Sequence, residues 1–226
     1  MNKSVFARSI GLLGEENFNK IQDKVIAVFG LGGVGGTALE ALARTGFQRF
    51  IIVDFDKVDP SNLNRQILYT YDDIGKDKVE IAKKRVLAIN PEAIVEVCNL
   101  KAQDFDYNQK IDFIVDAIDD VDGKLFILSK AQEKGIPSIM SLGMANRFDP
   151  SKVRVAKLNQ TQNDPLARKM RYLVKKQGLN LSGVSVIISD ELPKKNGEIL
   201  YSTMMVPSAA GLNIAKFILE CIIDNK

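Results

Sequence analysis

A glycine-rich turn after an apolar segment is the first feature of this sequence with a chemical meaning. Gly30, Gly32 and Gly35 fit the spacing G-x-G-x-x-G and directly follow the apolar run 24–29. The missing side chains let the backbone approach a phosphate at the start of a helix. Asp54 lies about 20 residues further on, where an acidic side chain accepts hydrogen bonds from a ribose. The turn and the acid predict a nucleotide site, but both ATP and NAD have such a ribose.

Three polar side chains further along the chain favour ATP over NAD. They are Asn62, Arg65 and Lys78. A triphosphate needs several hydrogen-bond donors, and the transition state at its α-phosphorus needs more. Arginine offers a planar fork of donors and lysine a mobile point charge, whereas a nicotinamide site needs little charge beyond the turn. Each cation alone would be a solvated surface charge, but together they predict a site that attacks ATP.

A group of carboxylates follows another apolar run, 113–116. Asp119 is expected just past the carboxyl end of a central strand, where open α/β sheets bind their ligands. A carboxylate there can hold Mg²⁺ together with phosphate oxygens. Asp116 and Asp120 are alternatives for this role, and at least one carboxylate is expected to cap the following helix.

The elements that must position these side chains follow from the pattern of apolar residues. Short apolar runs, typical of buried parallel strands, alternate with segments that have apolar residues at helical spacing. The alternation predicts an α/β fold with a Rossmann-like, mostly parallel sheet and helices on both faces. The expected strands are 24–29, 50–53, 94–97, 113–116 and 137–141, and the expected helices are 37–45, 76–89, 125–133 and 165–176.

The pattern changes after Pro150, but no second domain is indicated. We expect one domain over residues 1–226, with a nucleotide-binding core at 1–150 and a C-terminal extension at 151–226 that meets the substrate. The extension is expected to add strands and a terminal helix to the same sheet. These elements are 153–158, 184–189 and 207–223, and residues 194–197 are expected to form a turn.

Composition limits the classes of function. A net charge of only +3 means that contact with nucleic acid requires a local basic patch. The absence of histidine excludes an imidazole base and histidine-containing metal sites. Cys98 and Cys221 form no C-x-x-C motif, which argues against zinc and for a cytoplasmic protein. The apolar segment 209–223 is interrupted by charges, so no stable membrane insertion is expected.

Several spaced motifs follow one another along the first two thirds of the chain. They are Gly30-Leu-Gly-Gly-Val-Gly-Gly36, Asp54-Phe-Asp56, Ser61-Asn-Leu-Asn-Arg-Gln66, Gly75-Lys-Asp-Lys-Val-Glu80, Ile89-Asn-Pro91 and Asp116-Ala-Ile-Asp119. Together they resemble the ThiF/MoeB family of ubiquitin-activating-enzyme-like adenylating proteins. Within that family, the chain is most similar to the tRNA threonylcarbamoyladenosine dehydratases, through residues 40–46, 116–119, 148–150 and 163–169.

The resemblance implies a reaction and a set of residue roles. ATP would adenylate the carboxylate of N6-threonylcarbamoyladenosine at position 37 of tRNA, and ring closure would release AMP, a net dehydration. It implies a homodimer in which Arg8 reaches the ATP of the partner subunit, Mg²⁺ on Asp119, and a monovalent cation. The catalytic residues would be Arg8, Arg65, Lys78 and Asp119, and the ATP-binding residues Gly30, Gly32, Gly33, Gly35, Asp54, Asn62, Arg65, Gln66 and Lys78.

The chain departs from many relatives in its cysteines. The cysteine pairs that hold zinc in many relatives are absent, and 204–211 has no cysteine where dehydratase relatives can carry one, so covalent thioester chemistry is not expected.

The expected tRNA contacts are basic residues of the helix 165–176, although each alone would be a solvated charge. They are Arg168, Lys169 and Arg171, with Lys175, Lys176, Lys194 and Lys195 as further members of the patch.

Three alternative functions remain open at this stage. In the first alternative, the protein activates the C-terminus of a ubiquitin-like sulfur-carrier protein, with sulfur-transfer proteins as partners. A second alternative is an NAD-dependent oxidoreductase, which leaves Arg65 and Lys78 unexplained and has no evident hydride-transfer acid or base. The third is a nucleotide sensor that binds ATP but releases no AMP.

Overall fold

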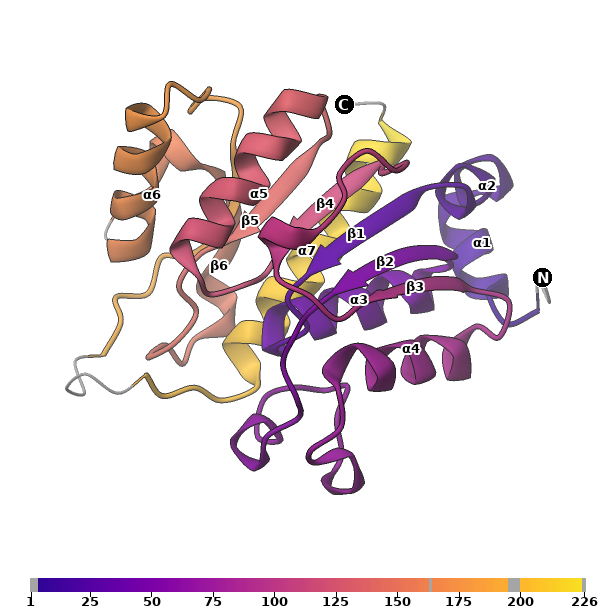
Figure 1. The fold of residues 1–226 in the computed structure, drawn as a ribbon. Helices are drawn as coiled ribbons and strands as arrows, with labels where there is room; N and C mark the ends of the chain where they lie inside the picture. Colours follow the sequence, from indigo (N-terminus) through magenta and orange to yellow (C-terminus); the bar gives the residue numbers. More distant parts are fainter. Residues whose placement is uncertain (1–3, 163, 195–199, 225–226) are drawn as a thin grey trace.

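The computed structural model describes residues 4–162, 164–194 and 200–224, which form a sheet covered by helices (Figure 1). The seven strands lie in the order β3-β2-β1-β4-β5-β7-β6. Neighbouring strands are parallel, except that β6 runs antiparallel to β7 at the end of the sheet. The predicted α/β fold with C-terminal strands added to a mostly parallel sheet is confirmed. The strands are β1 Val25–Phe29, β2 Arg49–Val53, β3 Ile94–Cys98, β4 Phe113–Asp116, β5 Ser138–Ser141, β6 Val153–Lys157 and β7 Ser185–Ser189.

Helices cover both faces of the sheet because its central strands are apolar on both sides. In β1, Ile26 and Val28 pack with one set of helices, whereas Ala27 and Phe29 pack on the opposite face. The first set comprises α1 Ala7–Leu13, α2 Glu15–Gln22, α3 Gly33–Thr45, α4 Lys78–Ile89 and α7 Met205–Ile223. The opposite face carries α5 Val121–Lys134 and α6 Pro165–Lys176.

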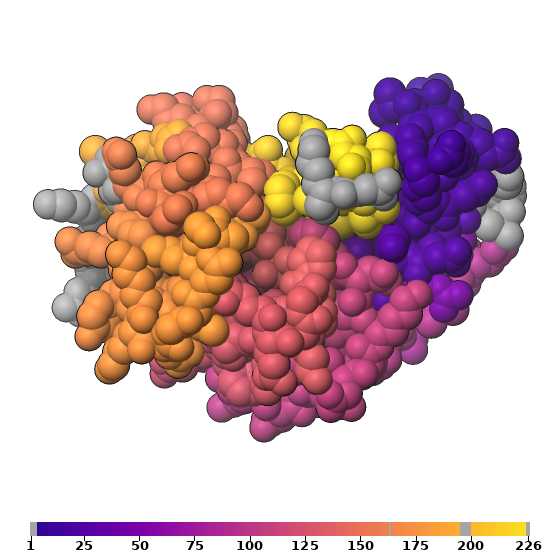
Figure 2. All heavy atoms as spheres, turned by 90° about the horizontal axis from the view of Figure 1, so that it is seen from above, coloured from indigo at the N-terminus to yellow at the C-terminus, as the bar shows by residue number. Residues whose placement is uncertain are grey.

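The C-terminal helix α7 packs closely on α3. A Cβ atom at Gly211 would lie 2.6 Å from the Val34 carbonyl oxygen, so the two helix backbones approach where this side chain is missing. Ile214 and Ile218 are fully buried in the core beneath α7. By length and composition alone α7 could also cross a membrane. One side of the helix packs in the core, as the prediction of a terminal helix on the sheet requires. Figure 2 shows this yellow segment between the indigo N-terminal helices and the orange region that includes α6.

Element boundaries differ from the sequence-based prediction where turns join helices. The helix expected at 37–45 begins at Gly33, because the glycine turn itself forms the first helical turn. The helix expected at 125–133 begins at Val121, after Asp120 caps it. Residues 195–197 of the expected turn, and Lys195 of the basic patch, lie outside the described residues.

Candidate nucleotide site

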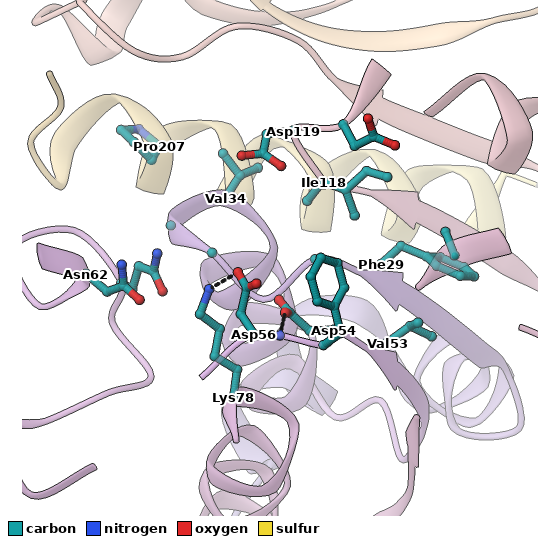
Figure 3. A pocket seen from close by; sticks show the side chains of 18 of the residues that line it. Phe29, Val34, Val53, Asp54, Asp56, Asn62, Lys78, Ile118, Asp119 and Pro207 are labelled. Carbon is teal, nitrogen blue, oxygen red and sulfur yellow. Dashed lines mark hydrogen bonds and ion pairs between the residues drawn. The ribbon is translucent and has the colours of Figure 1, made fainter. Parts of the chain in front are cut away.

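A pocket of about 600 Å³ lies at the carboxyl ends of β1, β2 and β4 (Figure 3). Its size is typical of small-ligand sites, and its position is where open α/β sheets bind ligands. The fold brings most of the predicted site residues to this one pocket, although they span the chain from the first turn to the β4–α5 loop. Those that line it are Gly30, Gly32, Gly33, Asp54, Asn62, Arg65, Gln66, Lys78 and Asp119.

The glycine turn forms the floor of the pocket. Gly30 has φ +85°, and a Cβ atom there would lie 2.7 Å from the Ala117 carbonyl oxygen. Gly35 packs beneath the turn, where a Cβ atom would lie 1.9 Å from the Gly30 carbonyl oxygen. The helix α3 starts at Gly33, so its first N–H groups and its positive dipole end face the pocket. This geometry suits a phosphate, with Gly35 shaping the turn from below.

Asp54 is buried at the end of β2 and ties the turn to the next loop. Its Oδ2 accepts a hydrogen bond from the Leu31 N–H at 2.6 Å, and its Oδ1 accepts one from the Asp56 N–H at 2.9 Å. Burial raises the pKa of Asp54, and the nearby charge of Lys78 opposes that rise. The carboxylate therefore caps the loop, which the sequence left as the alternative to ribose binding. Each oxygen keeps a second lone pair for a ligand hydroxyl.

Lys78 and Asp56 form an ion pair inside the pocket (Figure 3). The Nζ–Oδ2 distance is 2.7 Å, and the Lys78 side chain is 7% exposed whereas that of Asp56 is 52% exposed. The Lys78 N–H also donates to the Asp56 carbonyl oxygen at 3.0 Å. The sequence analysis assigned Asp56 no role of its own in the site. Its partner lies on α4, so only the tertiary fold reveals the pair.

The loop after β2 contributes Asn62, Arg65 and Gln66. The Asn62 Oδ1 accepts a hydrogen bond from the Asp59 N–H at 3.1 Å, which leaves its amide N–H groups for a ligand. The Arg65 Nη1 donates to the Ser61 carbonyl oxygen at 2.5 Å, which leaves donors on the rest of the guanidinium. The Gln66 Oε1 is buried with no hydrogen-bond partner among the described residues. An unpaired buried polar atom in a pocket fits a site shaped for a ligand.

The structure separates the three carboxylates of the β4–α5 loop. Asp116 is buried, and its Oδ1 accepts from the Lys124 Nζ at 2.9 Å. Asp120 caps α5 by accepting from the Gly123 N–H at 2.6 Å. Asp119 and Asp120 are both exposed and both line the pocket. Among the described residues the Asp119 side chain makes no hydrogen bond or ion pair, so it is freer to meet a ligand than Asp120, which caps α5.

Other predicted residues lie away from the pocket lining. Arg8 is exposed on α1, and Arg168 and Lys169 are exposed on α6. Arg171 donates from Nη1 to the Thr161 carbonyl oxygen at 2.9 Å, so it holds α6 to the preceding loop. Cys98 ends β3, and burial raises the pKa of its thiol to about 11. A thiol with that pKa is a poor nucleophile at neutral pH.

Residues 6–221 match the ThiF family. The chain belongs to the ThiF family. This ThiF-family chain is 38% identical over 196 residues to the tRNA threonylcarbamoyladenosine dehydratase of Bacillus subtilis (strain 168). The aligned residues cover 83% of this chain and 75% of that protein.

A solved structure of a ThiF-like relative has nearly the same fold. The Escherichia coli tRNA N6-threonylcarbamoyladenosine dehydratase in complex with ATP gives a TM-score of 0.92 at 31% identity, covering 99% of this chain and 95% of that chain. A more distant relative is subunit 2 of the SUMO-activating enzyme of Dictyostelium discoideum. It is 30% identical over 173 residues, which covers 75% of this chain but 26% of that protein.

Proposed function

We propose that this protein uses ATP to dehydrate, and thereby cyclise, N6-threonylcarbamoyladenosine at position 37 of tRNA. The observation that carries the proposal is the pocket itself, in which a glycine turn, Asn62, Arg65 and Lys78 surround one space. The likeness to dehydratases over most of the chain supports the choice of substrate. Asp54 binds the ATP ribose, and the three donors bind the phosphates.

The reaction has two steps, and both use nucleophiles from the substrate. A carboxylate oxygen of the threonylcarbamoyl group attacks the α-phosphorus of ATP, and pyrophosphate leaves. The substrate then attacks its own acyl carbon, the ring closes, and AMP leaves with the former carboxylate oxygen. Arg65 and Lys78 stabilise negative charge at phosphorus, and the pocket holds the reactants together. A site without histidine and with Cys98 as a neutral thiol suits this chemistry.

Asp119 is the residue that would hold Mg²⁺. Its exposed carboxylate fits, because Mg²⁺ commonly binds one or two carboxylates together with substrate phosphates and water. Among the described residues no cluster of three or more Cys, Asp or Glu side chains forms a closed metal site. When bound, the ion supplies positive charge to the phosphate oxygens. A monovalent cation belongs to the same proposal, with no side chain assigned to it.

The proposal includes partners beyond the pocket. In a homodimer, Arg8 of one subunit would reach the phosphates bound by the other, which gives the exposed position of Arg8 on α1 a role. The exposed Arg168 and Lys169 of α6 would contact the tRNA backbone, with Arg171 orienting that helix. Such a tRNA-modifying enzyme works in the cytoplasm.

Activation of a ubiquitin-like sulfur carrier is the alternative. The similarity to a SUMO-activating enzyme subunit favours it, because both reactions begin by adenylating a carboxylate. Sulfur-transfer proteins would then be partners. Trapping an acyl-adenylate on a purified carrier protein would establish this alternative.

Nucleoside mass spectrometry tests the main proposal. Purified protein is incubated with ATP, Mg²⁺ and tRNA that contains threonylcarbamoyladenosine. The expected result is loss of one water from that nucleoside with release of AMP, in the native protein but not in the Arg65→Ala variant. If threonylcarbamoyladenosine stays unconverted although ATP binds, the proposal is refuted. The remaining functions would then be a nucleotide sensor or the activation of a carrier protein.

A further inference from the structure

Two large exposed aromatic side chains lie on segments that lead into the pocket lining. Phe148 is 59% exposed and Tyr201 is 53% exposed. Both adjoin the pocket in sequence: Ser202, next to Tyr201, lines it, and so do Met144 and Ala145 on the loop that leads to Phe148. The backbone segments that carry the two rings therefore adjoin the pocket lining, although the rings themselves are not part of it.

Asn146 joins the two segments that carry these rings. Its N–H donates to the Tyr201 carbonyl oxygen at 2.7 Å, and its Oδ1 accepts from the Tyr201 N–H at 2.8 Å. Its carbonyl oxygen accepts from the Lys194 N–H at 2.7 Å. Asn146 has φ +59°, a left-handed conformation that asparagine tolerates better than most residues. One residue thus fixes Tyr201, Lys194 and the start of the Phe148 loop relative to one another.

A buried arginine anchors the same loop from below. The Arg147 Nε donates to the Glu191 carbonyl oxygen at 2.8 Å, its Nη2 donates to the Asp164 Oδ2 at 3.0 Å, and its Nη1 donates to the Gly143 carbonyl oxygen. The Glu191 carboxylate accepts from the Phe148 N–H at 2.8 Å. The backbone that presents Phe148 is therefore held from several directions, although the ring itself faces solvent. A rigid support beneath an exposed ring is typical of a binding surface rather than of an incomplete core.

A positive charge lies over the Phe148 ring, and the Glu191 carboxylate contacts the Phe148 backbone. The Lys194 Nζ lies 5.7 Å from the centroid of the Phe148 ring. Aromatic rings with nearby cations bind single-stranded nucleic acid, because bases stack on the rings and cations attract the backbone. A modifying enzyme that takes one base into its pocket must unstack it from its neighbours. Those neighbours then need new stacking partners at the pocket mouth.

We propose that Phe148, Tyr201 and Lys194 form an aromatic rim that stacks the unpaired RNA bases flanking the modified nucleotide. This inference rests on the proposed function for the choice of RNA as partner. It moves Lys194 from the predicted basic patch to the aromatic rim, and the contact it describes is distinct from the basic residues of α6. A second copy of the chain is the competing occupant of these exposed rings, and the test below includes it.

Alanine variants of the rim test the inference by direct binding. Phe148→Ala, Tyr201→Ala and the double variant are titrated against fluorescently labelled tRNA, and the Kd for ATP is measured in parallel. Each single variant is expected to weaken tRNA binding by between about fivefold and a hundredfold, and to leave the ATP Kd and the melting temperature unchanged. Phe148→Trp is expected to restore binding, because it keeps a stacking face. Tyr71→Ala is the matched control, since this tyrosine is 80% exposed and lies outside both the pocket lining and α6.

Two results would overturn the rim. The first is unchanged tRNA affinity in the double variant. The second is a shift of the double variant from dimer to monomer in light scattering, which would reassign the rings to a contact between subunits. Because binding needs no turnover, these results are independent of the dehydration assay. If the native protein forms no cyclic product, the proposed function fails whether or not the rim binds RNA.

Discussion

Lys78→Ala is the variant that most directly tests the phosphate site. In the structure the Lys78 ammonium lies 2.7 Å from the Asp56 carboxylate, and its side chain is 7% exposed. Solvent and salt therefore screen it less than a surface lysine. Bound ATP would bring more negative charge to the same place than Asp56 does, so we expect the ammonium to turn to a phosphate oxygen.

The size of the effect follows from this geometry. A hydrogen bond that involves a charged group contributes about 1.5–3 kcal/mol. Loss of one such bond to phosphate is expected to raise the Kd for ATP by about tenfold to just over a hundredfold. The variant also leaves the Asp56 carboxylate without its partner, and repulsion between this carboxylate and the phosphates adds to the loss.

Calorimetry with a non-hydrolysable ATP analogue separates these two contributions. The affinity is measured for the native protein, Lys78→Ala, Asp56→Ala and the double variant. If Lys78 binds phosphate directly, its removal still weakens binding when Asp56 is absent. If Lys78 only neutralises Asp56, its removal costs nothing in that background, and the reasoning is refuted. Lys76→Ala is the matched control, because this lysine is 50% exposed and pairs with Asp73 outside the pocket.

Four further predictions concern the site and the surfaces around it. Gly35→Ala places a Cβ atom 1.9 Å from the Gly30 carbonyl oxygen, so ATP binding and the melting temperature should both fall, whereas Gly11→Ala, with no atom within 4 Å, should leave both intact; equal melting temperatures would contradict the clash. Arg8→Ala and Arg65→Ala should each be inactive alone but regain activity when their subunits are mixed, and no recovery in mixtures shown to exchange subunits would exclude a shared site. Alkylation of Cys98 by iodoacetamide, followed by mass spectrometry, should be slow at pH 8 and accelerate towards pH 11, because its raised pKa keeps it protonated; fast labelling at pH 8 would contradict this. Cys98→Ser should keep full activity. Arg168→Ala combined with Lys169→Ala should weaken tRNA binding and reduce its salt dependence but spare ATP binding; unchanged tRNA affinity would remove α6 from the interface.

Local patterns in the sequence predicted the fold and the type of site. The alternation of apolar strands and amphipathic helices depends on residues close together in the chain, so it predicted the sheet and its C-terminal extension. The glycine spacing needs only a strand before it and a helix after it, and α3 indeed begins inside the turn at Gly33. The sequence favoured Asp119 among the carboxylates after β4 but left Asp116 and Asp120 as alternatives. The fold removes Asp116 from the choice, because it is buried against Lys124, whereas Asp119 and Asp120 both line the pocket.

The glycine turn, Asp54 and the donors that follow them could therefore be predicted as a nucleotide site from the sequence alone, because that prediction depends on residue type and spacing. The tertiary structure decided which partners these groups have. Asp56 meets Lys78 across 22 positions, and Asn146 meets Tyr201 across 55. Contacts at such separations depend on how the sheet brings the loops at its carboxyl edge together. No local sequence pattern predicts these long-range contacts. The ion pair within the pocket and the proposed aromatic rim therefore became visible only in the folded chain.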